Sequence, residues 1–184
     1  MTDLVQKRKI DWKEFQGLVG KICRDISNDS WKPDYVVGIT RGGLLPALMI
    51  SHYFNIPCQT LKVSLRDNYE TESNCWMAEE AFGYYEGSDE KYQPSIKRNI
   101  LIVDDINDTG ATINWILNDW RASCLPAHSG WDQVWNNNVR FAVIVDNESS
   151  QSEVKMDYCG LEVNKAVNNV WIDFPYEDWW AKYD

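Results

Sequence analysis

Basic residues are scarce in this chain. Its 184 residues include 18 lysines and arginines against 28 aspartates and glutamates, which gives a net charge of −10 at pH 7. A protein that binds nucleic acid usually carries a basic surface that contacts the phosphate backbone. The charge balance therefore argues against DNA or RNA as a partner. It also means that an anionic substrate has to be bound by local cationic side chains and backbone amides, because the overall field repels it.

The sequence also lacks a long apolar run and a paired cysteine motif. No segment approaches the run of about 20 apolar residues that a membrane helix needs, and the N-terminus shows no apolar signal region. The five cysteines are scattered without a Cys-x-x-Cys pair, and His52 and His128 lie in no metal-ligand spacing. These absences argue against a membrane protein, a disulfide framework and a zinc site, so we expect a cytoplasmic protein.

Segments with strand and helix patterns alternate along the chain. A helical stripe over 11–26 begins at Asp11, a typical N-cap residue, and a second helix is predicted over 44–54. Strands are predicted at 35–40, 60–64, 100–103, 139–145 and 158–163. This alternation predicts an α/β fold with a central, mainly parallel sheet flanked by helices, and the length fits a single domain over 1–184.

One connection is much longer than the others. Residues 66–91 hold eight acids against two basic residues, and unstructured connections of this length are uncommon in compact domains. We therefore expect a long flexible-loop region over 66–97, which serves either as a functional lid or as a surface insertion that binds a partner.

Residues 99–112 carry the most informative pattern, Asn-Ile-Leu-Ile-Val-Asp-Asp-Ile-Asn-Asp-Thr-Gly-Ala-Thr. A buried strand ends in Asp104 and Asp105, a third acid, Asp108, follows, and a small-residue turn opens a helix. Such a turn at a helix N-terminus binds phosphate through backbone amides, and Gly110 lets the backbone approach it closely. Carboxylates beside a phosphate site suit sugar hydroxyls or Mg²⁺.

This run resembles the phosphoribosyl-diphosphate (PRPP) binding motif of type I phosphoribosyltransferases, in which two acids and two variable residues precede Asp-Thr-Gly-x-Thr. The resemblance implies that Asp104 and Asp105 hold the ribose hydroxyls, and that Asp105, with Asp104 as a second candidate, reaches a Mg²⁺ ion. Asp108 would lie near the reacting base and act as the catalytic residue that takes its proton. The 5′-phosphate would be surrounded by Asp108, Thr109, Gly110, Ala111 and Thr112.

An earlier strand also ends in a small-residue loop, Arg41-Gly42-Gly43. The guanidinium of Arg41 presents a fork of donors that suits phosphate oxygens. By itself such a loop is equally typical of a tight turn with a surface arginine. The loop resembles the first PRPP-binding loop of the family, which implies that Arg41, Gly42 and Gly43 contact the pyrophosphate.

The segment 170–177 near the C-terminus reads Val-Trp-Ile-Asp-Phe-Pro-Tyr-Glu. It resembles the base-covering segment of 6-oxopurine phosphoribosyltransferases, notably bacterial xanthine-guanine and archaeal hypoxanthine enzymes. The resemblance implies a small C-terminal hood over 164–184, in which Trp171 stacks on the base and the Ile172 backbone reads the base edge. The alternative is an aromatic strand that fills the core.

One position departs from the purine-specific pattern. Those relatives carry a lysine after the fourth core strand that donates to the 6-oxo group, whereas this chain has Asp146 and Asn147 there. The amide of Asn147 can still donate to the base, and Lys155 or Lys165 can supply a cation from a neighbouring loop. Guanine, xanthine and hypoxanthine all remain open as the base.

The resemblance implies a phosphoribosyltransferase of purine salvage that uses PRPP, a nucleobase and Mg²⁺, binds neither nucleic acid nor membrane, and forms a dimer or tetramer. A transferase for adenine or a pyrimidine, or a PRPP-fold regulatory or sensing protein without transferase activity, is the alternative. A response-regulator receiver, with Asp146 as the phospho-acceptor, is a third possibility. It is disfavoured because too few residues follow Asp104 for such a domain and because it has no use for the Thr-Gly-Ala-Thr turn.

Overall fold

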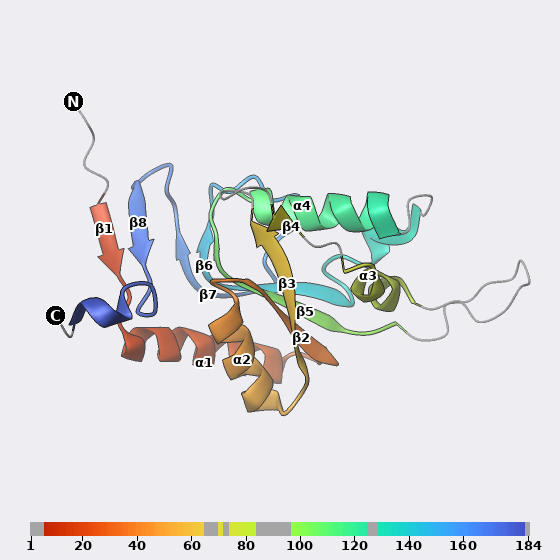
Figure 1. The fold of residues 1–184 in the computed structure, drawn as a ribbon, viewed down its shortest axis with the longest axis horizontal. Helices are drawn as coiled ribbons and strands as arrows, with labels where there is room; N and C mark the ends of the chain where they lie inside the picture. Colours follow the sequence, from red (N-terminus) through yellow and green to blue (C-terminus); the bar gives the residue numbers. More distant parts are fainter. Residues whose placement is uncertain (1–5, 65–69, 72–73, 84–96, 125–128, 183–184) are drawn as a thin grey trace, which may run out of the picture.

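A six-stranded sheet forms the centre of the molecule (Figure 1). The computed structural model describes residues 6–64, 70–71, 74–83, 97–124 and 129–182. The strands, in the order in which they lie in the sheet, are β4 (Glu70–Thr71), β3 (Cys58–Ser64), β2 (Tyr35–Thr40), β5 (Ile100–Asn107), β6 (Val139–Asn147) and β7 (Tyr158–Val163). All neighbouring pairs are parallel except β3 with β4. The predicted mainly parallel sheet is confirmed.

Helices cover both faces of this sheet. They are α1 (Trp12–Asn28), α2 (Leu44–Phe54), α3 (Cys75–Phe82) and α4 (Ala111–Asp119). Figure 1 shows α1 and α2 on one face and α3 and α4 on the other. Along β5, Ile100 and Ile102 pack with α3 and α4, while Leu101 and Val103 pack with α1 and α2. Both faces of the strand are therefore buried, which explains its unbroken apolar run.

Strand β5 is longer than the sequence predicts. Its pairing with β2 ends where Gly38 lies opposite Val103, but it continues beside β6 until Asn107 lies opposite Asp146. Asp104 and Asp105 therefore belong to the strand and extend beyond the end of its pairing with β2. This overhang brings both carboxylates to the level of the loop that follows β2.

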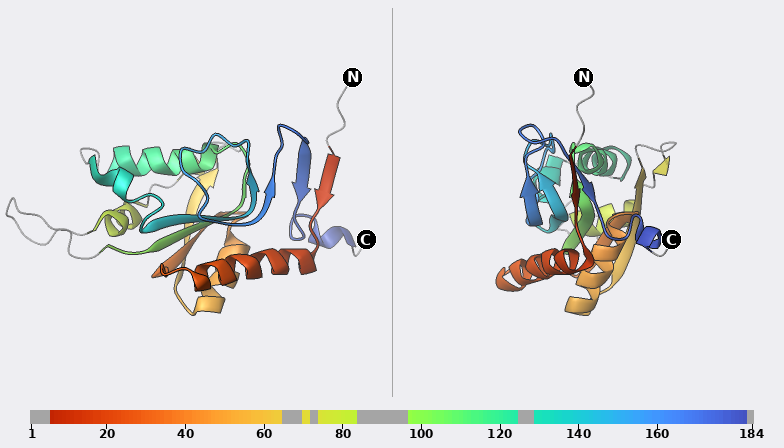
Figure 2. Two further views of the ribbon diagram at one scale, coloured as in Figure 1. Left: turned by 180° about the vertical axis from the view of Figure 1, so that it is seen from behind. Right: turned by 90° about the vertical axis from the view of Figure 1, so that its left-hand side faces the viewer.

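A second, two-stranded sheet lies at one end of the molecule, where β1 (Gln6–Lys9) pairs in parallel with β8 (Val170–Asp173) (Figure 2). A short 3-10 turn, η3 (Trp179–Lys182), follows β8. We call this end, β1 together with residues 164–182, the hood. Because β1 is short and almost wholly charged, the sequence pattern did not predict it.

The segment predicted as a flexible loop contains a core helix. The apolar side chains of α3 (Met77, Ala78, Ala81 and Phe82) are buried against the sheet. This part of the predicted loop over 66–97 is therefore helical. Positions 66–69, 72–73 and 84–96 lie outside the described residues. Among the described helices, none is long and apolar enough to cross a membrane.

A cluster of indole rings fills the core beside α4. Trp120 is fully buried and begins the π-helical turn η1 (Trp120–Cys124). The centroid of its ring lies 5.6 Å from that of Trp135 and 6.3 Å from that of Trp131. Trp131 belongs to the 3-10 turn η2 (Ser129–Gln133). Burial of such large side chains dominates core energetics. The cluster therefore anchors α4 and the turn at its start.

Truncation of Trp120 tests this anchor. Trp120→Ala leaves a large cavity and should lower the free energy of unfolding by about 3–5 kcal/mol. The matched control is Trp179→Ala, whose side chain is 57% exposed and whose loss should change stability by about 0.5 kcal/mol or less. Urea unfolding followed by far-UV circular dichroism measures both. Equal losses in the two variants would contradict the packing described.

Candidate active site

A large cavity lies at the carboxyl ends of β2 and β5. From this pair the chain continues through α2 to β3 in one direction and through α4 to β6 in the other, so the two loops diverge and leave a crevice. The cavity has a volume of about 1150 Å³. The predicted site residues on its wall are Arg41, Gly42, Asp104, Asp105, Asp108, Thr109, Gly110, Ala111, Thr112, Trp171 and Ile172.

The turn before α4 lies at one end of this cavity. Gly110 is the N-cap residue of α4 and has a φ of 86°, a conformation that side chains rarely adopt. A Cβ added there would lie 2.4 Å from the backbone nitrogen of Ser152. Glycine has no side chain to cap the helix, although the backbone N–H of Ala111 donates to Oγ1 of Thr109 (3.3 Å). The positive end of the helix dipole lies at this end of the cavity, a typical setting for an anion.

Asn147 supports this turn instead of forming part of the cavity wall. Its Nδ2 donates to the carbonyl oxygen of Asp108 (2.8 Å), and its Oδ1 accepts from the backbone N–H groups of Lys165 (3.0 Å) and Ser149 (3.3 Å). The side chain is 5% exposed. The expected contact between Asn147 and the base therefore has no basis in this arrangement, because the amide already pairs with the backbone.

Two further contacts hold the same turn in place. The backbone N–H of Gln151 donates to the carbonyl oxygen of Thr109 (3.0 Å), and Nδ2 of Asn114 in α4 donates to the carbonyl oxygen of Gln151 (2.8 Å). The loop after β6 thus fixes the turn from the side opposite the cavity.

Gly42 and Asp105 bring the two loops into contact. A Cβ on Gly42 would lie 2.0 Å from Oδ2 of Asp105, so the carboxylate rests against the loop backbone and only glycine leaves room for it. Arg41 precedes this contact on the cavity wall. Gly43 is buried behind the loop, where it packs against the carbonyl oxygen of Val103, and does not line the cavity.

Tyr176 completes the surroundings of Asp105. Its hydroxyl donates to Oδ2 of Asp105 over 2.9 Å. Burial raises the pKa of Asp105, and the hydrogen bond from Tyr176 opposes that rise. Burial and the nearby charge of Asp105 raise the pKa of the Tyr176 hydroxyl, which therefore stays protonated and acts as the donor. Tyr176 was not among the predicted site residues, although it lies within the segment that resembles the base-covering segment.

The opposite end of the cavity is aromatic. Trp171 in β8 is 46% exposed, while the neighbouring Ile172 is buried, as the alternation along a strand requires. Phe174 also lines this end. An exposed indole ring beside a cavity is a suitable stacking surface for a planar ligand.

A lysine from the hood lies beside the turn before α4. Nζ of Lys165 is 2.9 Å from Oδ1 of Asp108, and both residues line the cavity. Of the two lysines that the sequence left open, the structure brings Lys165 into the site, whereas Lys155 is exposed and does not line the cavity. Lys62 in β3 also lines it and was not predicted.

The two acids of β5 are suited to a magnesium ion that is shared with a substrate. Asp104 and Asp105 are adjacent, and the backbone N–H of Asp105 donates to Oδ1 of Asp104 (2.9 Å). Among the described residues, no group of three or more histidine, cysteine or acidic side chains forms a metal cage. Mg²⁺ typically binds one or two carboxylates and completes its shell with substrate phosphates and water. The donor set fits that mode.

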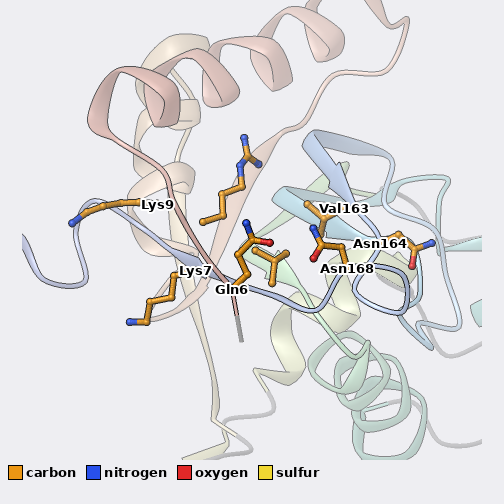
Figure 3. A pocket seen from close by; sticks show the side chains of 8 residues that line it. Gln6, Lys7, Lys9, Val163, Asn164 and Asn168 are labelled. Carbon is orange, nitrogen blue, oxygen red and sulfur yellow. The ribbon is translucent and has the colours of Figure 1, made fainter. Parts of the chain in front are cut away.

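A smaller cavity of about 490 Å³ lies beside β1, between Gln6, Val170 and the loop residues Asn164 and Asn168 (Figure 3). Figure 3 shows Lys7 and Lys9 pointing away from the two asparagines. Arg8 is paired with Glu14 at 2.6 Å. No acid is among the described residues that line this hollow, so it does not offer the combination of charges found in the larger cavity.

Sequence comparison with protein families agrees with this geometry. The model of the phosphoribosyl transferase domain matches residues 10–179, nearly the whole chain. The chain belongs to this family. Among curated proteins, this phosphoribosyl transferase domain is similar to xanthine phosphoribosyltransferase 1 of Saccharomyces cerevisiae, with 22% identity over 131 residues. The match covers 62% of this chain and 60% of the yeast protein, so the chain spans about three fifths of that relative.

Solved structures share the fold of this phosphoribosyl transferase domain. The purine phosphoribosyltransferase of Pyrococcus horikoshii OT3 matches with a TM-score of 0.59 and 20% identity, over 94% of this chain and 95% of that one. The xanthine-guanine-hypoxanthine phosphoribosyltransferase of Helicobacter pylori matches with a TM-score of 0.63 and 14% identity, over 98% of both chains.

The structural role of Asn147 is open to a direct test. Asn147→Ala leaves the carbonyl of Asp108 and the N–H of Lys165 without their partner and should lower the free energy of unfolding by about 1–3 kcal/mol. The control is Asn137→Ala, which removes an exposed side-chain hydrogen bond to the Gln133 carbonyl and should have little effect. Denaturant unfolding of both variants makes the comparison. Equal stability of the two would show that Asn147 does not support the turn.

Proposed function

We propose that this protein transfers the 5-phosphoribosyl group of PRPP to a 6-oxopurine, giving a nucleoside 5′-monophosphate and pyrophosphate. One observation carries the proposal. A single cavity is lined by the glycine turn before α4, by the acids of β5 and by an exposed indole ring. A phosphate, a ribose and a planar base need surroundings of those three kinds.

Different residues of the cavity would bind different groups of PRPP. The amides of 109–112 would bind the 5′-phosphate, Asp104 and Asp105 the ribose hydroxyls, and Arg41 with Lys62 the pyrophosphate. The turn and Asp105 are held by hydrogen bonds before the ligand arrives. Fixed donors of this kind stabilise developing charge without reorganising, so positioning and electrostatics supply the catalysis.

The reaction would exchange one bond at C1′ of the ribose. A ring nitrogen of the base forms a bond to C1′, the bond from C1′ to the pyrophosphate oxygen breaks, and the nitrogen's proton passes to Asp108. A Mg²⁺ ion held by Asp105, with Asp104 as a further ligand, would neutralise charge on the pyrophosphate. Asp108 lines the same cavity as Trp171, which supports its assignment as the proton acceptor.

Base recognition is proposed to depend on Trp171 and Lys165. The indole of Trp171 would stack on the purine, and the ammonium of Lys165 would donate to its 6-oxo group. In this way Lys165 would supply the cation that the sequence pattern lacks after β6. The purine enzymes among the relatives support a purine as the acceptor.

Three further expectations accompany this proposal. They are a role in purine salvage, a cytoplasmic location and a homo-oligomeric state, dimer or tetramer. Light scattering of the purified protein determines the last of these directly. A monomer at micromolar concentration would contradict it.

The proposed activity is tested with a panel of acceptors. Purified protein is incubated with PRPP, Mg²⁺ and guanine, hypoxanthine, xanthine, adenine, uracil or orotate, and pyrophosphate release is measured. Release with at least one 6-oxopurine is expected. Turnover with adenine or a pyrimidine alone would show that the acceptor is not a 6-oxopurine. PRPP binding without turnover on any base would favour the sensing alternative over the transferase.

The role of Lys165 yields a separate prediction. Lys165→Gln removes the charged donor and should lower kcat/KM for the 6-oxopurine about 10- to 100-fold, since a hydrogen bond from a charged group contributes about 1.5–3 kcal/mol. Lys155→Gln is the matched control, because this lysine is exposed outside the cavity. If both variants retained the wild-type kcat/KM, Lys165 would have no part in base recognition.

A further inference from the structure

Tyr176 connects three parts of the chain that are distant in sequence. It follows β8 in the hood, yet its hydroxyl donates to Oδ2 of Asp105 in β5 over 2.9 Å. The same oxygen lies 3.4 Å from the carbonyl oxygen of Gly42 in the loop after β2. One phenol group thus spans the hood, the acid strand and the loop that carries Arg41.

The ring of Tyr176 is held firmly by other aromatic side chains. It stacks on Phe174, with a centroid distance of 5.5 Å and an interplanar angle of 8°, and meets Phe15 of α1 edge to face at 5.6 Å. These contacts tether the hood to the core without the hydroxyl. The hydroxyl therefore has a separate effect, which is to fix the carboxylate it contacts.

The carboxylate of Asp105 is enclosed between Tyr176 and Gly42. The close approach of Gly42 limits the carboxylate on one side, and the phenol donates to the same oxygen, Oδ2. A hydrogen bond of this length from a hydroxyl is directional. Such a bond holds the carboxylate in one orientation before any ligand binds.

We propose that Tyr176 is a positioning residue, which holds the Asp105 carboxylate against the Gly42 backbone so that the hood covering the base also orients the ribose-binding acid. The inference rests on the proposed function, because it assigns Asp105 to the ribose. It adds a residue of the base-covering segment to the PRPP end of the cavity. Loss of the hydroxyl is therefore expected to weaken the binding of PRPP and to change the binding of the base much less.

The test compares Tyr176→Phe with Tyr53→Phe. The first variant keeps the stacked ring and removes the hydroxyl alone, while the second makes the same chemical change at a tyrosine that is 59% exposed. In Tyr176→Phe the Kd for PRPP, measured by calorimetry, and the KM for PRPP are both expected to rise about tenfold. The KM for the base should change by less than about twofold. Tyr53→Phe should match the wild type.

A double-mutant cycle with Asp105→Asn separates positioning from a general structural effect. If Tyr176 acts through Asp105, the double variant binds PRPP no more weakly than Asp105→Asn alone. The inference would be overturned if the two substitutions weakened PRPP binding additively, or if Tyr176→Phe left the Kd for PRPP unchanged. It would also be overturned if Tyr176→Phe weakened the binding of PRPP and of the base equally. A wild-type protein that binds PRPP but releases no pyrophosphate would overturn the proposed transferase activity, while the calorimetric Kd would still decide the role of Tyr176.

Discussion

The contact between the Asp105 carboxylate and the Gly42 backbone is the constraint on which the cavity depends. It exists because β5 extends beyond the end of its pairing with β2, so its acids reach the loop that follows β2. A side chain at position 42 would displace the Asp105 carboxylate. With glycine there, the acids, the loop arginine and the turn before α4 meet at the point where the sheet's connections diverge.

The rest of the site is fixed from outside the cavity. Asn147 and the loop after β6 hold the turn at 108–110 through backbone carbonyls, and the indole cluster holds the helix that follows it. The ligand-facing groups are therefore backbone amides and short acids whose positions are set by buried contacts. The backbone N–H of Lys165 also donates to Oδ1 of Asn147. Preorganisation of this kind suits a reaction in which positioning and charge stabilisation carry most of the catalysis.

Local features of the site were predictable from the sequence, and features that depend on distant contacts were not. The run 99–112 encodes strand, acids and turn by spacing, so it indicated the acids and the anion-binding turn together. The burial of Asn147, the approach of Lys165 and the reach of Tyr176 depend on how the hood packs on the sheet. Strand β1 is too short and charged to show a pattern, and the acidic surroundings of α3 concealed its buried stripe.

A crystal structure of the protein with PRPP and Mg²⁺ tests the central claim most directly. The account predicts the 5′-phosphate within about 3 Å of the backbone nitrogens of 109–112, the ribose hydroxyls beside Asp104 and Asp105, and the pyrophosphate next to Arg41. PRPP bound in the reverse direction, with its 5′-phosphate at Arg41, or bound outside this cavity, would contradict it.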